Sequence, residues 1–333
     1  MSVGLAFVAL GLGGLVSLGT SWVLVSRLER VGARFGLSEG LLGLVAALAA
    51  DAPEITASVA SLLQHERTIG AGVVLGSNVF NLAALLGLGA VVAGGIALHR
   101  KVVLFGGAVA VFMATVCVLT VAEVVSLALG LVLVLVVLAA YAIVLGAHRR
   151  VFASVPLPPG WTAWLTTAIL EEETELEEAI RPQPGTRNDI ITAMGALVVV
   201  VLASIAMEQG ASTLGRHYGV SEIVIGGLVL AAVTSLPNVV AAVFLARKGR
   251  GAAALSTALS SNNINVAAGL LIPAAFLGLA KPSSSGLLVA GWYLGLTVLT
   301  IGLAYIGRGL SRSSGWLIMA AYVAFVVVLL ATT

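Results

Sequence analysis

The stretch ALAADAPE at residues 47–54, followed by GSNVFN at residues 76–81, decides the fold of this chain, because a related pair recurs 184 residues later. The second pair reads AAVTSLPN at residues 231–238 and SSNNIN at residues 260–265. In each copy an Asn lies 25 residues after the Pro. A paired motif at matching spacing in the two halves of an apolar chain is typical of membrane transporters built from internal repeats.

The composition is that of a protein embedded in a lipid bilayer. Of 333 residues, 59% are hydrophobic and 10% are charged, whereas soluble domains carry about 25% charged residues. Such a chain has too few charged residues to cover a folded protein with a water-soluble surface, so we expect a polytopic membrane protein. Cys117 is the single cysteine, which excludes a disulfide framework.

Ten apolar segments are long enough to cross a bilayer, so we expect an all-α fold of about ten transmembrane helices. The chain enters the first segment without a basic region or a cleavage site, and we interpret this segment as a span and not as a signal peptide. The second, third, seventh and eighth segments carry the motifs and are interrupted by Pro, Gly, Ser or Asn. Interrupted backbone at membrane depth is tolerated only where protein or a water-filled cavity satisfies its polar groups, which predicts a site there. The segments run roughly over residues 3–25, 37–62, 68–97, 102–121, 124–147, 189–213, 221–246, 251–278, 287–306 and 315–331.

The ten segments divide into two halves of five. We expect a first five-helix repeat over residues 1–147, a linker over residues 148–188 and a second repeat over residues 189–333. Because five is odd, the second repeat enters the membrane from the opposite side, and the two repeats are inverted relative to each other. The linker carries Pro156, Pro158 and Pro159, followed by Trp161 and Trp164 and by an acidic run at residues 171–178. We interpret it as a solvated linker, with a short interfacial amphipathic helix as the alternative.

The distribution of basic residues predicts the orientation. The loops after the first, third, fifth, seventh and ninth spans contain 14 of the 17 Lys and Arg residues. Loops rich in Lys and Arg stay in the cytoplasm. We therefore expect a multi-pass protein of the plasma (inner) membrane, with a cytoplasmic linker and both termini outside.

Asp51 and Glu54 are the only two acids that we place well inside an apolar span. They are three residues apart, which puts both side chains on one face of a helix. No Lys, Arg or His lies inside any expected span to neutralise them. An unpaired carboxylate at membrane depth is costly, so each acid must take up a proton or bind a cation. The alternative is a protonated carboxyl group that a neighbouring helix satisfies.

The remaining polar residues of the motifs supply neutral oxygen atoms. Ser and Asn oxygens are hard ligands that suit Na⁺ or Ca²⁺ and are poor ligands for soft metals. Asn78 and Asn262 are either part of this set or hold helices together by hydrogen bonds. We expect Gly70, Gly72 and Gly76 to allow close helix packing. The polar candidates are Ser77 and Asn81 in the first repeat, and Ser235, Asn238, Ser261 and Asn265 in the second.

The prolines of the two motifs interrupt the helices beside these residues. Pro53 and Pro237 remove backbone donors, so we expect free carbonyl groups around residues 49–51 and 233–235 that are able to coordinate an ion.

At these residues the chain resembles the calcium/cation antiporter superfamily, the sodium/calcium exchangers and their relatives. The two repeats of that family read approximately GTSLPE and then GSNxFN. Here residues 49–54 and 233–238 resemble the first element, residues 76–81 match the second closely, and residues 260–265 match it less well. The resemblance covers nearly the whole chain, since span number, orientation and linker position also agree.

The resemblance implies an antiporter that exchanges Ca²⁺, or a related cation, for Na⁺ or H⁺. It implies no cofactor and no enzymatic activity, and inorganic cations and the lipid bilayer as partners, with no nucleic acid. In the family, two motif glutamates coordinate Ca²⁺, and flanking Ser, Thr and Asn residues complete sites for Na⁺ or protons. Carried over to this chain, the implied metal ligands are Glu54, Asp51, Ser77, Asn81, Ser235, Asn238, Ser261 and Asn265.

The chain departs from the family pattern at two positions. Asn238 stands where the family has its second glutamate, and Asp51 stands where it has Ser. If Asp51 faces the site, two carboxylates remain to balance Ca²⁺. If it points away, a single charge remains, which suits a monovalent ion or a proton better.

Four alternatives compete with this interpretation. An intramembrane enzyme would use Asp51 and Glu54 as a carboxylate pair, but it would need a further acid from another span, and we place none at depth in the second half. A channel would usually show a ring built by several subunits or repeats. A transport-inactive relative or a monovalent cation/proton antiporter on the same fold completes the alternatives.

The orientation is testable with single cysteines. We expect an impermeant thiol reagent applied to intact cells to label a cysteine placed at Thr332, but not one placed at Thr174, in a Cys117→Ala background. Labelling at position 174 without labelling at position 332 contradicts the orientation.

Overall fold

A computed structural model describes residues 1–37, 39–146 and 184–333 of the chain, and nearly all of these residues are helical. Helix is the expected outcome in a bilayer, because it satisfies backbone N–H and C=O groups within one segment. Most of the expected linker, with its tryptophans and its acidic run, lies outside the described residues. The elements are α1 (Val3–Arg34), α2 (Glu39–Ala50), α3 (Ala52–Leu63), α4 (Arg67–Asn81), η1 (Leu82–Leu88), α5 (Gly89–Ala93), β1 (Gly95–Ala97), α6 (Arg100–Val121), α7 (Leu127–Gly146), α10 (Arg187–Tyr218), α11 (Glu222–Val224), η2 (Ile225–Leu230), α12 (Ala231–Thr234), α13 (Leu236–Arg247), α14 (Gly251–Ile264), η3 (Asn265–Leu271), α15 (Ile272–Leu277), α16 (Ser284–Gly307), β2 (Gly309–Ser311) and α17 (Arg312–Thr332).

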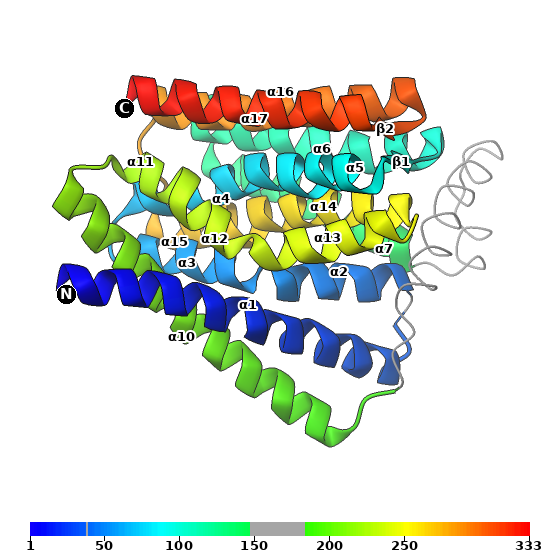
Figure 1. Cartoon of the computed structure of the whole chain (residues 1–333), viewed down its shortest axis with the longest axis horizontal. Helices are drawn as coiled ribbons and strands as arrows, with labels where there is room; N and C mark the ends of the chain where they lie inside the picture. The colour runs from blue at the N-terminus through cyan, green and yellow to red at the C-terminus, as the bar shows by residue number, and fades with distance from the viewer. Residues whose placement is uncertain (38, 147–183) are drawn as a thin grey trace.

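The two halves of the chain run in opposite directions through one bundle. In Figure 1, α1 runs from left to right and α10 from right to left, and each later helix of the second half likewise opposes its counterpart in the first. Both chain ends lie at the left end of the bundle, while α7 ends and α10 begins at the right end, which we call the linker end. The inverted five-helix repeats expected from the sequence are therefore confirmed.

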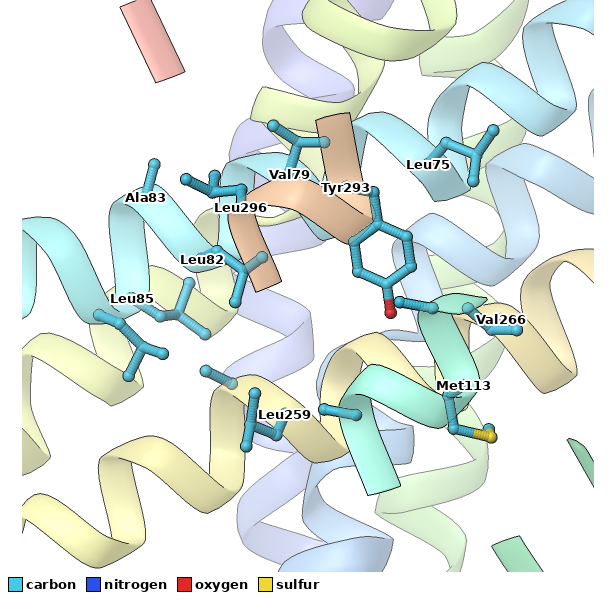
Figure 2. Packing of buried hydrophobic residues seen from close by; sticks show 14 of the residues in the cluster. Leu75, Val79, Leu82, Ala83, Leu85, Met113, Leu259, Val266, Tyr293 and Leu296 are labelled. Atoms are coloured by element: carbon cyan, nitrogen blue, oxygen red, sulfur yellow. The ribbon is translucent and has the colours of Figure 1, made fainter. Parts of the chain in front are cut away.

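The helices that carry the motifs form the centre of the bundle. The helix from Arg67 to Ala93 is 94% buried over its most apolar window, whereas the corresponding figure for α7 is 17%. Figure 2 shows Leu82, Met113, Leu259 and Tyr293 packed together from four different helices. Helices α1 and α10 pack side by side along one edge of the bundle, with their lipid-facing sides exposed (Figure 1).

Two of the four expected interruptions are sharp bends. The segments Leu44–Ala50 and Ala52–Leu63 meet at 52°, and Glu222–Thr234 and Leu236–Arg247 meet at 50°. Each bend precedes a proline in the first turn of the next helix, at Pro53 and Pro237. A proline ring clashes with the carbonyl group four residues earlier, which accounts for the bends.

The third and eighth spans are not broken, contrary to expectation. Helix α4 continues into the π-helical segment η1, and α14 continues into the π-helical segment η3. Ser and Asn do not remove backbone donors, so they do not interrupt a helix as proline does. Single π-helical turns inside α-helices are nevertheless frequent at functional sites.

Counting the spans by length and composition gives seven membrane-crossing helices among the described residues, or nine when each bent pair counts as one span. The one expected span outside this count is the eighth, which corresponds to the continuous helical run of α14, η3 and α15. This run is not among the nine, and it carries the Ser and Asn residues of the second motif.

A short antiparallel ribbon closes the linker end of the bundle. Strand β1 pairs with β2 so that Gly95 faces Ser311 and Ala97 faces Gly309. The ribbon satisfies backbone groups at the two places where the chain turns between helices, and it joins the first repeat to the second (Figure 1).

The expected glycine contacts are present where α4 crosses η2. A Cβ atom on Gly76 would overlap the carbonyl oxygen of Gly227, and one on Gly72 would lie 3.0 Å from the Gly227 backbone nitrogen. Gly70 makes a similar approach to the Ser58 carbonyl oxygen, at 2.9 Å. Such backbone-to-backbone contacts exclude any side chain, so these glycines hold the motif helix in the bundle centre.

We therefore expect Gly76→Ala to lower the free energy of unfolding by about 1–3 kcal/mol, because the added methyl group separates two backbones. Thermal unfolding in detergent measures the change. Gly195→Ala is the matched control, since a Cβ at Gly195 meets no atom within 4 Å. Equal melting temperatures for the two variants contradict the close approach.

Candidate ion-binding site

The two bends and the two motif helices bring all eight candidate residues into the interior. Asp51 lies at the bend between α2 and α3, and Glu54 in the first turn of α3. Ser235 and Asn238 occupy the corresponding positions of the second repeat. The other four candidates lie on α4, α14 and the first residue of η3. All eight side chains are fully buried: Asp51, Glu54, Ser77, Asn81, Ser235, Asn238, Ser261 and Asn265.

The Asn238 side-chain amide joins the two repeats at the centre of this cluster. Its Nδ2 atom donates to Asp51 Oδ1 at 2.7 Å, to Glu54 Oε1 at 3.3 Å and to Ser261 Oγ at 3.3 Å. The Ser261 hydroxyl group also donates to Asp51 Oδ1, at 2.6 Å. Because both carboxyl groups accept from one nitrogen atom, Asp51 and Glu54 face the same point, and each contacts Asn238 of the second repeat.

Asn78 and Asn262 hold α4 and α14 together by a reciprocal pair of hydrogen bonds. Asn78 Nδ2 donates to the Asn262 carbonyl oxygen at 3.3 Å, and Asn262 Nδ2 donates to the Asn78 carbonyl oxygen at 3.1 Å. Their side-chain oxygens in turn accept from Asn265 and Asn81, at 3.2 and 3.1 Å. Of the two roles considered for Asn78 and Asn262, the structure supports the one that links helices and orients neighbouring amides.

Seven oxygen atoms of the cluster accept no hydrogen bond, although they are buried. Nearly all buried polar atoms of proteins have a hydrogen-bond partner, so a concentration of unpartnered acceptors marks a place where a positive charge binds. Carboxylate, amide and hydroxyl oxygens are the ligands that Na⁺ and Ca²⁺ prefer. The seven atoms are Asp51 Oδ2, Glu54 Oε2, Ser77 Oγ, Asn81 Oδ1, Ser235 Oγ, Asn238 Oδ1 and Asn265 Oδ1.

The charge balance of the cluster favours a cation. Within the described residues neither Asp51 nor Glu54 forms an ion pair. Nor does any group of three or more His, Cys, Asp and Glu side chains occur there that could hold a metal ion. The cluster therefore combines two carboxyl groups with neutral oxygens, a combination unsuited to soft transition metals.

The expectation of free backbone carbonyls is only partly met. The carbonyl group of Asp51 accepts from Ile55 N at 3.0 Å, and that of Ser235 accepts from Val239 N at 3.1 Å. Both are thus engaged by the helix that follows. Pro53 and Pro237 have no N–H group, so the carbonyls that lose their helical donors are those of Ala49 and Val233.

A cavity of about 580 Å³ leads away from the cluster. Helices α1, α2, α13 and α14 form its walls, and Asn238 lies at its inner end. Phe244 and Leu245 line it nearer the C-terminal end of α13, which points toward the linker end in Figure 1. Thr257, one helical turn before Ser261, also lines it. The cavity therefore extends from beside Asn238 toward the linker end of the bundle.

Sequence reasoning missed two acids. Glu29 lines the cavity wall on α1, and Glu208 is fully buried on α10. Asp51 and Glu54 are therefore not the only acids that face the interior of the described bundle. The first span is expected to end at residue 25, but α1 continues to Arg34, because a charged residue does not end a helix, and a hydropathy boundary therefore excludes Glu29. Glu208 lies inside the sixth expected span, residues 189–213, but near its end, and it belongs to neither repeated motif.

Comparison with known proteins identifies a family model and several relatives. The model described as "Sodium/calcium exchanger protein" matches residues 5–147 and 190–331. Sodium/potassium/calcium exchanger 1 of Mus musculus is 34% identical over 94 residues, which is 28% of this chain and 8% of the mouse protein. The same exchanger of Gallus gallus is 31% identical over 159 residues, which is 44% of this chain and 24% of the chicken protein. The matches thus span less than a quarter of these relatives' own length.

The fold matches that of a solved structure. The sodium-calcium exchanger NCX_Mj, soaked with 100 mM Na⁺ and 10 mM Sr²⁺, aligns over 97% of this chain and 98% of its own, with a TM-score of 0.60 and 20% sequence identity. At this level of identity the match supports the fold alone.

The cavity makes a prediction about access. We expect a cysteine at Thr257, in a Cys117→Ala background, to react with a small thiol reagent supplied from the linker end, because Thr257 lines the cavity. Thr300→Cys is the matched control, since Thr300 is fully buried and does not line the cavity. The rate of cysteine modification is measured in vesicles of both orientations. Reaction at position 257 only from the end that carries the termini contradicts the assignment of the cavity to the linker end.

Proposed function

Since the chain belongs to the sodium/calcium exchanger protein family, we propose that it is a secondary antiporter that exchanges Ca²⁺, or a related cation, for Na⁺ or H⁺. The observation that carries this proposal is the set of seven buried, unpartnered oxygen atoms around Asp51 and Glu54. The names of the relatives, sodium/potassium/calcium exchangers and a sodium-calcium exchanger, point to the same class of ions. The transported ions are substrates, and no resident cofactor is required.

The two carboxyl groups favour a divalent substrate. Asp51 Oδ1 and Glu54 Oε1 share one donor, so the second oxygen of each acid is available to the same ion. Two ionised carboxylates balance the charge of Ca²⁺ without a third acid. Asp51 thus takes over the negative charge that the family places at position 238.

The Asn238 amide offers a way to exchange ions without leaving the acids unpaired. In the structure its NH₂ group donates to both carboxyl groups, while its Oδ1 atom has no partner. Rotation of the amide presents Oδ1 to a bound cation and withdraws the NH₂ group from the acids. The side chain therefore acts as a donor in the cation-free site and as a ligand in the loaded one.

The pseudo-symmetric asparagines supply matching neutral ligands. The NH₂ groups of Asn81 and Asn265 are engaged by Asn262 and Asn78, which leaves both Oδ1 atoms as acceptors. Ser77 and Ser235 each add an unpartnered hydroxyl oxygen. These oxygens complete the coordination that the two acids begin, for Ca²⁺ or for the counter-ion.

The access route follows from the cavity and the proposed orientation. With both termini outside the plasma membrane, the linker end faces the cytoplasm, and we assign the cavity to the cytoplasmic side of the site. Glu29 is the one charged residue among the described residues that line the cavity. A carboxylate on a low-dielectric wall raises the local concentration of cations, so we assign Glu29 to the cation entry path.

A monovalent cation/proton antiporter on the same fold is the second candidate. The observation that favours it is the replacement of the family's second glutamate by Asn238, whose amide already engages an oxygen of each acid. If one of the two acids stays protonated during transport, the remaining charge balances a single monovalent ion.

Flux through the purified protein in proteoliposomes tests the class of function. We expect uptake of ⁴⁵Ca²⁺ that requires an outward gradient of Na⁺ or H⁺ on the opposite side. Flux without a counter-ion indicates a channel. Exchange of monovalent ions without any Ca²⁺ flux overturns the divalent assignment and favours the second candidate.

A series of site variants tests the roles of the two acids. We expect Glu54→Gln to abolish exchange while the protein still folds, because the amide keeps the shape of the side chain and removes its charge. Asp51→Ser should reduce divalent transport far more than monovalent transport, since one carboxyl group remains. Adding Asn238→Glu to Asp51→Ser rebuilds two carboxyl groups and should restore Ca²⁺ flux. Unchanged Ca²⁺ exchange in Asp51→Ser excludes Asp51 as a ligand.

A further inference from the structure

A second group of polar residues lies where α10 packs against the turn between α3 and α4. The group contains Glu208 and Ser212 of α10, Gln64 and Glu66 of the turn, and Arg216 one helical turn further along α10. In Figure 1 this turn and the C-terminal end of α10 both lie at the end of the bundle that carries the chain termini. The group is therefore separate from the central site and from its cavity.

Each of the two acids has one satisfied and one unsatisfied oxygen atom. Gln64 donates to Glu208 Oε2 at 2.5 Å. Ser212 and Arg216 both donate to Glu66 Oε1, at 2.9 and 2.5 Å. Glu208 Oε1 and Glu66 Oε2 are buried and accept no hydrogen bond.

The two carboxyl groups adjoin each other, and Glu208 also adjoins the Ser61 hydroxyl group. Glu208 is fully buried, and the side chain of Glu66 is 14% exposed. Two carboxyl groups in contact cannot both remain ionised without a positive charge between them. A single proton or a Na⁺ ion at this point satisfies both unpartnered oxygens at once.

The surrounding groups do not supply that charge. Arg216 contacts the outer oxygen of Glu66, and its own side chain is 69% exposed. The guanidinium group of Arg67 lies against Gly278, where a Cβ atom would be 2.9–3.0 Å away. His65 of the turn itself, His217 and Glu222 are exposed, and the part of α1 that precedes Arg27 carries no charged residue. With both acids ionised, the pair and Arg216 together carry one net negative charge, which a monovalent ion neutralises.

We propose that Glu66 and Glu208 bind one monovalent cation, a proton or Na⁺, and that this ion holds α10 against the turn between α3 and α4. The proposal goes beyond the exchange function, because it concerns neither the central oxygens nor the cavity. Without the ion, the two adjacent carboxylates repel each other, and α10 loses a contact with the α3–α4 turn. When the ion is bound, both carboxylates share its positive charge, and α10 stays packed against the α3–α4 turn.

The experiment uses the full chain with both central carboxyl groups removed, Asp51→Ser with Glu54→Gln, so that ions at the central site do not contribute. Hydrogen–deuterium exchange of the backbone around residues 63–67 and thermal unfolding are measured in detergent. Na⁺ is varied at fixed pH against choline, and pH is varied without Na⁺. Glu208→Gln and, independently, Glu66→Gln are added to this background. Glu222→Gln is the matched control, because Glu222 is an exposed acid on the neighbouring helix α11.

We expect one of the two ions to slow exchange around residues 63–67 and to raise Tm by about 2–4 °C, the shift that a ligand bound well above its Kd produces in a domain of this kind. A response to Na⁺ at fixed pH identifies Na⁺, and a response only to lowered pH identifies a proton. The response should disappear in Glu208→Gln and in Glu66→Gln, and should persist in Glu222→Gln. If one acid variant does not fold, the other decides. A background that responds to neither ion, or a response that survives in the folded acid variants, overturns the proposal.

Discussion

The hydrogen bonds from the Asn238 amide to Asp51 and Glu54 are the contact on which the arrangement of the centre depends. They join the bend of one repeat to the bend of the other, at a depth where no water replaces a lost partner. Around this contact the reciprocal Asn78–Asn262 pair fixes the crossing of α4 and α14. Close glycine contacts then bring α4 against η2. The bundle is thus assembled around polar atoms, while apolar packing surrounds them except on the side of the cavity.

The site combines a symmetric part with an asymmetric one. The asparagines at 78, 81, 262 and 265 form the same hydrogen bonds in both directions across the two repeats. The acids break this symmetry, since Asp51 and Glu54 both belong to the first repeat and face Ser235 and Asn238 in the second. The symmetric part holds the helices at a fixed crossing. The asymmetric part places all of the negative charge on one bent helix pair, and a change in its angle therefore moves both charges together.

The sequence allowed the fold and the central cluster to be predicted because both depend on regular features. Apolar segments define the spans, an odd number of them per repeat defines the inversion, and the 184-residue offset places Asp51 and Asn238 at matching bends. Features that depend on local geometry were not predictable. The π-helical segments η1 and η3 have no sequence signal as clear as the proline that marks a bend. Which oxygen atoms accept hydrogen bonds from the Asn238 amide depends on the rotation of its side chain. Glu29 was missed because hydropathy ends the first span before its charges, while α1 continues to Arg34, and Glu208 was missed because it lies near the end of its expected span and outside the repeated motifs.

The long sequence separation across the centre has a consequence for biogenesis. Asp51 receives hydrogen bonds from Asn238 and Ser261, which lie 187 and 210 residues later in the chain. At translation rates of about 5–20 residues per second, these partners emerge roughly 10–40 s after Asp51 does. During this interval the first repeat enters the bilayer with two acids and no donor from the second repeat. The newly made half must therefore carry Asp51 and Glu54 neutralised or near the lipid headgroups, and the arrival of the second repeat completes their insertion.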